Sequence, residues 1–127
     1  MNAIQWEASL SVGEEALDAD HQELVRLLNA VAACGPYFAE VFSALIDYTT
    51  RHFEREEDHL ARIGYPELER HRGLHDAFVA RLTRMLAAHA DDALAPADAE
   101  VAEMLWDWLR THILVEDRKY ADFASRR

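Results

Sequence analysis

The chain has 127 residues, half of them hydrophobic, with only four glycines and three prolines, which is typical of one compact helical domain and excludes a disordered chain. Its net charge of −11 opposes binding to nucleic acid and to anionic membrane surfaces, because both would repel it. The start of the chain lacks a signal-like segment and no apolar run reaches membrane-spanning length, so we expect a cytoplasmic protein without membrane insertion.

An N-terminal arm precedes four amphipathic segments. The arm covers residues 1–16, and its predicted packing residues are Trp6, Leu10 and Val12. In each later segment apolar residues recur with the 3.6-residue period of a helix. We predict a single domain over residues 1–127, with helices at about 17–33, 37–63, 67–89 and 97–117.

Glycine and proline separate the predicted helices, at Gly35-Pro36 and at Gly64 to Pro66. The short connections favour antiparallel neighbours, because a short loop cannot carry the chain back along a helix. We therefore expect an all-α fold, an up-down-up-down antiparallel four-helix bundle with an N-terminal extended arm.

Polar residues interrupt the apolar stripes at positions that share one level of this bundle. His52 and Glu56 lie one turn apart on the second helix, and His71 and His75 one turn apart on the third. His21 near the start of the first helix and His112 near the end of the fourth meet them in an antiparallel arrangement. Unpaired buried polar groups cost about 1–3 kcal/mol each, so five imidazoles in one core indicate a metal centre.

The number of donors indicates two metal ions, since one tetrahedral zinc needs only four ligands. Imidazole with carboxylate fits iron well, and manganese, cobalt or zinc are the alternatives. Cys34 is the only cysteine, which excludes an internal disulfide and a multi-cysteine site. It lies about 20 Å along the helix from His21, and we expect it to be a small buried hydrophobe.

Over nearly its whole length the chain resembles the hemerythrin family. The matching segments are Trp6 followed by LSVG, LDADH ending at His21, HFEREE from His52, GYPELERHRGLH through His75, and WLRTHILVED from Trp108 to Asp117. The resemblance implies a non-haem centre of two iron ions joined by an oxo or hydroxo bridge. In that family pattern one iron is bound by His71, His75 and His112, the other by His21 and His52, and Glu56 and Asp117 bridge them. Dioxygen would bind at an open position on the second iron.

In the fourth helix, helical periodicity and the family pattern predict different carboxylate ligands. Glu116 lies four residues after His112 and shares its face on an ideal helix, whereas Asp117 lies five residues after and points about 140° away. Periodicity favours Glu116. We assign Asp117 from the family pattern, which requires the helix to end, unwind or shift locally near Val115.

Three further polar residues are predicted to lie outside the ligand set. His59 forms a single Glu-x-x-His unit with Glu56 and is expected at the surface or its boundary, and His89 is expected to be solvated. Asp20 stands where the family often has glutamine. We expect it to be a solvated acid at the helix start; the alternative is that it accepts a proton from a ligand imidazole.

Reversible dioxygen binding for storage, delivery or scavenging is the function that the resemblance implies. An apolar wall would keep the open iron dry; its residues are Leu24, Leu28, Phe53, Leu109 and Ile113. We expect a monomer, because no long exposed apolar stripe requires a partner. We do not expect an enzyme, because the chain has no phosphate loop and no nucleophile motif. The alternatives are an oxygen, redox or iron-homeostasis sensing module and a di-iron oxidase or peroxidase.

Overall fold

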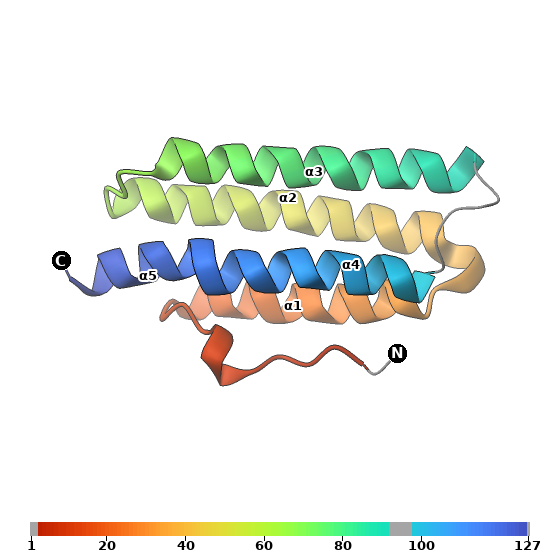
Figure 1. Ribbon diagram of the computed structural model, residues 1–127, viewed down its shortest axis with the longest axis horizontal. Coiled ribbons are helices and arrows are strands. Elements are labelled where there is room, and N and C mark those ends of the chain that lie inside the picture. Colours follow the sequence, from red (N-terminus) through yellow and green to blue (C-terminus); the bar gives the residue numbers. More distant parts are fainter. Residues whose placement is uncertain (1–2, 92–97, 127) are drawn as a thin grey trace.

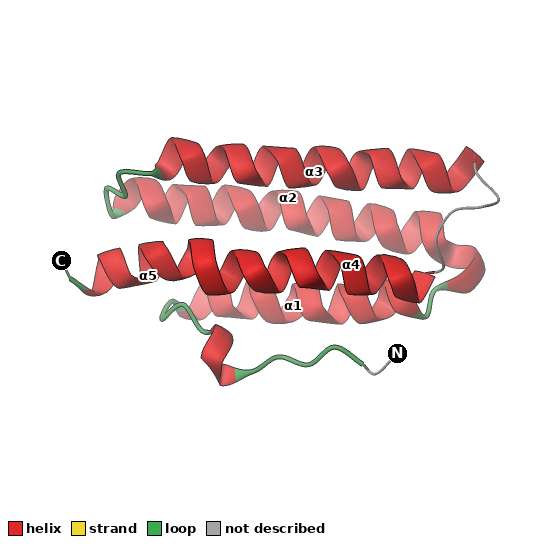
Figure 2. Ribbon diagram, viewed as in Figure 1, coloured by secondary structure: helices red, strands yellow, loops and turns green. Residues whose placement is uncertain are grey.

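The computed structural model describes residues 3–91 and 98–126, and in these ranges four long helices lie side by side without any strand (Figures 1 and 2). The helices are α1 (Glu15–Ala32), α2 (Phe38–Arg62), α3 (Leu68–Asp91) and α4 (Asp98–Thr111). Successive helices run in opposite directions, as Figure 1 shows. The predicted antiparallel four-helix bundle is therefore confirmed.

The last helix extends beyond its predicted end at residue 117. α4 continues without a break into a π-helical segment, His112–Asp117, and then into α5 (Arg118–Ser125). Tyr120 is fully buried and Phe123 is partly buried, so this extension gains packing against the bundle. The predicted start of the fourth helix at residue 97 lies outside the described residues.

The turn between α2 and α3 depends on a glycine. Gly64 has a φ of 70°, which is in the left-handed region where a side chain is strained. The amide of Tyr65 then donates to the carbonyl of Leu60 at 2.9 Å and closes the end of α2. This sharp reversal sets the first turns of α3 opposite the last turns of α2, where the predicted ligands lie.

The N-terminal arm lies along the bundle, held by hydrogen bonds at both ends (Figure 1). Ile4 exchanges two backbone hydrogen bonds of 2.8 Å with the side chain of Asn29 on α1. Arg118 of α5 donates to the carbonyls of Ser9 and Ser11 at 3.0 and 2.9 Å. The arm also contains a short 3₁₀ helix, Ala8–Leu10.

The arm's packing residues were predicted in part. Leu10 and Val12 are buried as expected, and Trp6 is partly buried. Ile4 is buried as well and was not predicted, because one isoleucine in an irregular segment has no periodicity to mark it.

The four seams between neighbouring helices are not equivalent. Among the described residues, α1 packs closely on α2 and α4, and α2 on α3, whereas the backbones of α3 and α4 approach each other less. Bulky rings fill this seam, since Phe78 of α3 stacks on Trp108 of α4 with ring centroids 3.7 Å apart. None of the described helices is both long and apolar enough to cross a membrane.

Candidate metal centre

All seven predicted ligand residues converge inside the bundle, toward the end at which α2 turns into α3. Their side chains are at most 5% exposed. Donor atoms fall into two groups whose members lie within 4.8 Å of one another. One group is Glu56, His71, His75, His112 and Asp117, and the other is His21, His52 and Glu56.

Glu56 belongs to both groups because its two oxygens face different histidines. Its Oε1 lies 2.8 Å from Nε2 of His71 and 3.0 Å from Nε2 of His75. Its Oε2 lies 3.5 Å from Nε2 of His52 and 3.7 Å from Nε2 of His21. This is the geometry of a carboxylate able to bridge two cations.

Asp117 divides its oxygens in the same way. Its Oδ1 lies 3.1 Å from Nε2 of both His71 and His112, and its Oδ2 lies 3.4 Å from Nε2 of His21. The π-helical segment makes this possible, because a π turn holds one more residue than an α turn and brings position i+5 back under position i. Glu116 instead points outward and pairs with Arg70.

A cation fits this cluster, because buried polar atoms in it lack partners. Within the described residues, the buried side-chain atoms without a hydrogen bond are both ring nitrogens of His21 and both carboxylate oxygens of Asp117. Buried polar groups in folded proteins are normally satisfied, so these atoms call for a missing partner. Imidazole nitrogens with carboxylate oxygens form a donor set that suits iron.

Without a cation, the carboxylates hold protons on the imidazoles. Burial by itself lowers the pKa of His21, but the Asp117 and Glu56 carboxylates outweigh burial and raise the pKa to about 9. The pKa of His71 rises to about 9 for the same reasons. Since a metal binds neutral imidazole, loading the site at neutral pH must release protons.

Asp20 is buried, so the expectation of a solvated acid was wrong. Its carboxylate lies 3.0 Å from Nδ1 of His52 and accepts two hydrogen bonds of 2.8 Å from Arg55 and one of 2.8 Å from Tyr48. Burial raises the pKa of Asp20, but His52, Arg55 and Tyr48 together hold it well below its usual range. An ionised Asp20 places the proton of His52 on Nδ1 and leaves Nε2 free to face the cluster.

A second carboxylate, not predicted from the sequence, supports His75. Glu57 lies 2.8 Å from Nδ1 of His75 and accepts a hydrogen bond of 3.1 Å from Arg72. Asp20 and Glu57 therefore each connect one candidate ligand to one arginine. Their sequence signal was weak, since an acid next to a candidate ligand is usually solvated.

Tyr120 was also missed. Its hydroxyl donates to Oε2 of Glu56 at 3.1 Å, and the side chain is fully buried. Burial and the charges of Glu56 and Asp117 raise its pKa well above the ordinary value, so the hydroxyl keeps its proton. Its position one turn after Asp117 could have indicated this role had the helix been predicted to continue.

The histidines predicted to lie outside the cluster do so. His59 is partly buried, with its ring centroid 6.0 Å from that of Tyr120. His89 is only partly solvated, because its ring stacks on Phe38 at 3.7 Å and its side chain is 34% exposed. Cys34 is buried, as expected.

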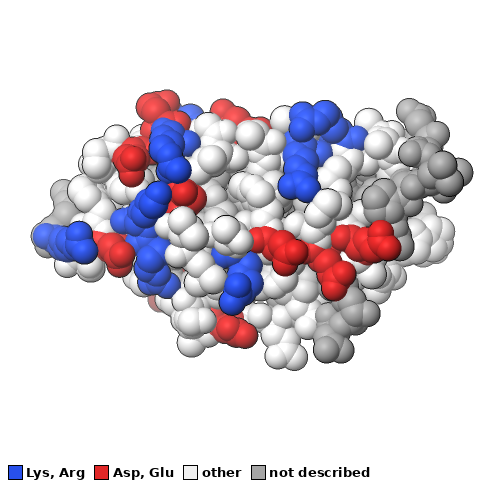
Figure 3. Space-filling view, viewed as in Figure 1, with Lys and Arg blue, Asp and Glu red and all other residues white. Residues whose placement is uncertain are grey.

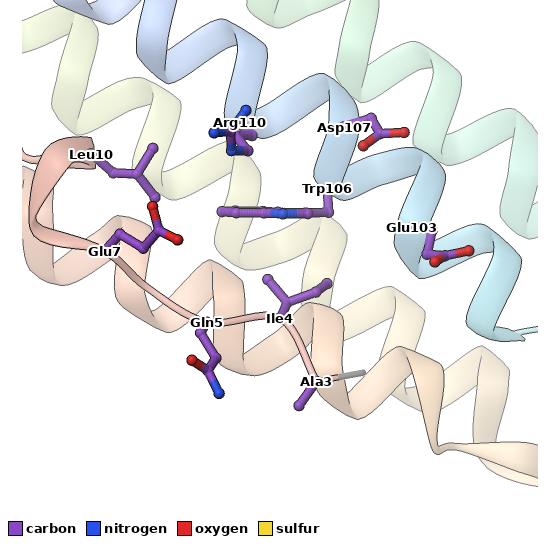
Figure 4. A pocket seen from close by; sticks show the side chains of 9 residues that line it. All are labelled: Ala3, Ile4, Gln5, Glu7, Leu10, Glu103, Trp106, Asp107 and Arg110. Atoms are coloured by element: carbon purple, nitrogen blue, oxygen red, sulfur yellow. The ribbon is translucent and has the colours of Figure 1, made fainter. Parts of the chain in front are cut away.

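A surface cleft of about 600 Å³ lies away from the cluster, between the arm and α4. Figure 4 shows Trp106 extending from α4 toward the arm, with Ile4 on one side and Arg110 on the other. Glu7 and Asp107 add acidic groups to the lining, but none of the seven predicted ligands borders the cleft. The cleft is therefore separate from the candidate metal centre.

Comparison with known proteins agrees with the motifs and the fold. The family model of the Hemerythrin HHE cation binding domain matches residues 12–124. A bacteriohemerythrin of Ralstonia nicotianae is 34% identical over 128 residues, covering 100% of this chain and 93% of that protein. A hemerythrin-like protein of Naegleria gruberi is 32% identical over 120 residues, covering 92% and 90% of the two chains. A crystal structure of a hemerythrin mutant has a TM-score of 0.86 at 26% identity, covering 98% of this chain and 99% of that one. The chain belongs to the hemerythrin family.

Proposed function

We propose that this chain binds dioxygen reversibly at a pair of iron ions, for storage, delivery or scavenging. The family and the buried cluster support a hemerythrin-type non-haem iron centre. In this proposal His71, His75 and His112 would hold one iron, His21 and His52 would hold the other, and Glu56 and Asp117 would be shared between them. A pair of ferrous ions held there would supply the two-electron redox chemistry that reversible dioxygen binding needs.

Unequal sharing of the donors is the observation that carries the proposal. Among the described residues, three imidazoles face one end of the two carboxylates, whereas only His21 and His52 face the other end. An ion held by fewer protein donors can accept an external ligand, as catalytic and ligand-binding metal sites do. The side of His21 and His52 is therefore the side at which dioxygen would bind.

The surroundings favour a small apolar ligand. A cavity of about 10 Å³, room for about one water-sized molecule, has a wholly apolar exposed lining. Three of its residues, Leu24, Thr49 and Leu109, lie three positions from His21, His52 and His112 and hence one turn away on the same faces. The predicted apolar wall is also buried, with side chains at most 4% exposed. A space this small suits a diatomic molecule better than an organic substrate, which supports binding rather than enzymatic turnover.

Anaerobic loading with two equivalents of ferrous iron tests the proposal. Exposure to air should produce a visible charge-transfer band, and removal of oxygen should abolish it over repeated cycles. His52→Ala should lose the band, since it removes one of two imidazoles on the open side. His59→Ala is the matched control, because His59 is on the same helix but outside the cluster, and it should keep the band.

Irreversible bleaching with turnover of added peroxide would contradict reversible binding and favour an oxidase or peroxidase. Failure of the protein to retain iron would contradict the di-iron site itself. The expectations of a cytoplasmic location and a monomeric state stay predictions.

A further inference from the structure

A surface groove follows the α3–α4 seam above the candidate metal centre. Its volume is about 450 Å³, and it is lined in part by Leu74, Met104, Trp108, His112 and Val115. Met104 and Val115 are large hydrophobic side chains that are 37% and 49% exposed. Figure 3 shows a stretch of uncharged surface in the middle of this seam, between basic side chains over α3 and acidic ones over α4. The charged residues that also line the groove are Arg81, Asp107 and Glu116. Here solvent-exposed apolar surface lies directly beside a candidate iron ligand.

Stacked rings connect this groove to the cluster. The Trp108 ring stacks on the His112 ring, with centroids 4.7 Å apart and planes 10° from parallel. His112 is 5% exposed, whereas the other six candidate ligands are at most 1% exposed. Trp108 itself is partly buried and borders the groove. A continuous aromatic contact therefore leads from the surface to a ligand.

Other aromatic residues beside the candidate ligands either are buried or do not stack on a ligand ring. Phe53 stacks on His75 at 3.7 Å but is buried. Trp6 is partly exposed, but its ring lies 6.1 Å from that of His21 and is tilted by 38°. Trp108 combines a stacked contact with access to a groove.

We propose that Trp108 and His112 form the route by which electrons return the iron pair from the ferric to the ferrous state. The inference rests on the proposed di-iron site. If dioxygen left as hydrogen peroxide, with two electrons from the iron pair and two protons from water, the pair would be left ferric and would have to be reduced before it could bind dioxygen again. Each ferric ion takes up one electron, so a one-electron donor at the groove is oxidised once per iron and two transfers restore the pair. No bond forms between donor and iron, and no atom is transferred.

A photosensitiser fixed in the groove tests the route. Val115→Cys gives an exposed thiol for a ruthenium polypyridyl label, while the native thiol of Cys34 stays unlabelled because it is buried and burial raises its pKa to about 11. After a flash in the presence of a sacrificial donor, the rate of ferric-to-ferrous reduction is followed by the loss of ferric absorbance. Trp108→Leu should slow this step several-fold, since an aliphatic side chain leaves a gap in the stacked contact.

Trp106→Leu is the matched control and should leave the rate unchanged, because Trp106 is on the same helix but lines the cleft beside the arm (Figure 4). Trp108→Phe preserves an aromatic ring if removal of Trp108 disturbs packing on Phe78, and its rate should lie between those of Trp108→Leu and the parent protein. Iron content and the reversible oxygen band are measured in every variant.

Equal rates in all variants, with two irons and a reversible oxygen band, would overturn the electron route and leave the proposed function intact. If Trp6→Leu slowed the reduction of the iron and Trp108→Leu did not, the proposed route would also be overturned, because electrons would then enter beside His21. Absence of iron or of the oxygen band in the parent protein would instead reject the proposed function.

Discussion

The second helix and the last helix each present one histidine and one carboxylate to the same cluster, but by different backbone geometry. α2 places His52 and Glu56 four residues apart on a regular α-helix. The last helix places His112 and Asp117 five residues apart on a π-helical segment. Equivalent positions in space therefore need not have equivalent spacings in sequence.

The two histidines are also held differently. On α2, Asp20 and Arg55 anchor His52 through polar contacts across the α1–α2 seam. On the last helix, the ring of His112 stacks on Trp108. One imidazole is thus oriented by a charged hydrogen bond and the other by a ring contact, which predicts different sensitivities to mutation.

The largest effect should follow removal of the π-segment carboxylate. Asp117→Ala should lose at least one of the two irons, because both of its oxygens face candidate ligands. Glu116→Ala should retain both, since Glu116 pairs with Arg70 at the surface. Iron counting on the purified proteins checks this. Loss of iron from the Glu116 variant alone would reverse the assignment.

A smaller effect should follow neutralisation of Asp20, the α1 carboxylate that contacts His52 of α2. Asp20→Asn should weaken metal affinity by about 10–100-fold, because carboxylates behind ligand histidines typically contribute that much. Competition with a chelator at fixed pH measures the change. Asp58→Asn removes the same charge from an exposed position on α2 and should have little effect. Equal weakening in both variants would show that only net charge matters.

The carboxylates from both helices should make the stability of the chelated, metal-free protein depend on pH. They raise the pKa values of His21 and His71 from 6.5 to about 9. A group whose pKa is higher in the folded than in the unfolded state stabilises the fold fully at pH values below its unfolded pKa. This stabilisation is lost as the pH rises through the folded pKa. The free energy of unfolding should therefore fall between pH 6.5 and 9 in denaturant titrations.

Iron should reverse this trend, because the bound imidazoles have already lost their protons and iron binding strengthens as pH rises. Asp117→Asn should flatten the slope of the metal-free protein, since it removes one source of the raised pKa values. A slope of the opposite sign in the metal-free parent protein would contradict the proton-holding cluster.

The smallest change in iron content is expected when the interval from His112 to Asp117 is shortened to the four residues that separate His52 from Glu56. Deletion of Val115 turns the five-residue interval from His112 to Asp117 into a four-residue α-helical one, which returns both residues to one face without moving α5 out of phase. The variant should retain two irons. Deletion of the exposed Glu54 is the matched control, because it shifts Glu56 out of its α-helical register with His52, and it should lose iron.

The amino-acid sequence by itself determined the bundle and most of the cluster. The 3.6-residue period, the glycine and proline breaks and the pairs His52/Glu56 and His71/His75 are local properties, so spacing alone could place them. Antiparallel order then brought His21 and His112 to the same level. The family pattern supplied Asp117, against the periodicity of its own helix.

Only the tertiary structure decided how these residues are supported. Packing between helices decides four features: the π turn, the burial of Asp20, and the contacts of Glu57 and Tyr120. In the sequence, an acid or tyrosine near a ligand looks the same whether it faces solvent or a neighbouring helix. The continuation to Ser125 likewise depends on packing of Tyr120 against the bundle. Local spacing fixes which face a residue occupies; the neighbouring helices decide what that face meets.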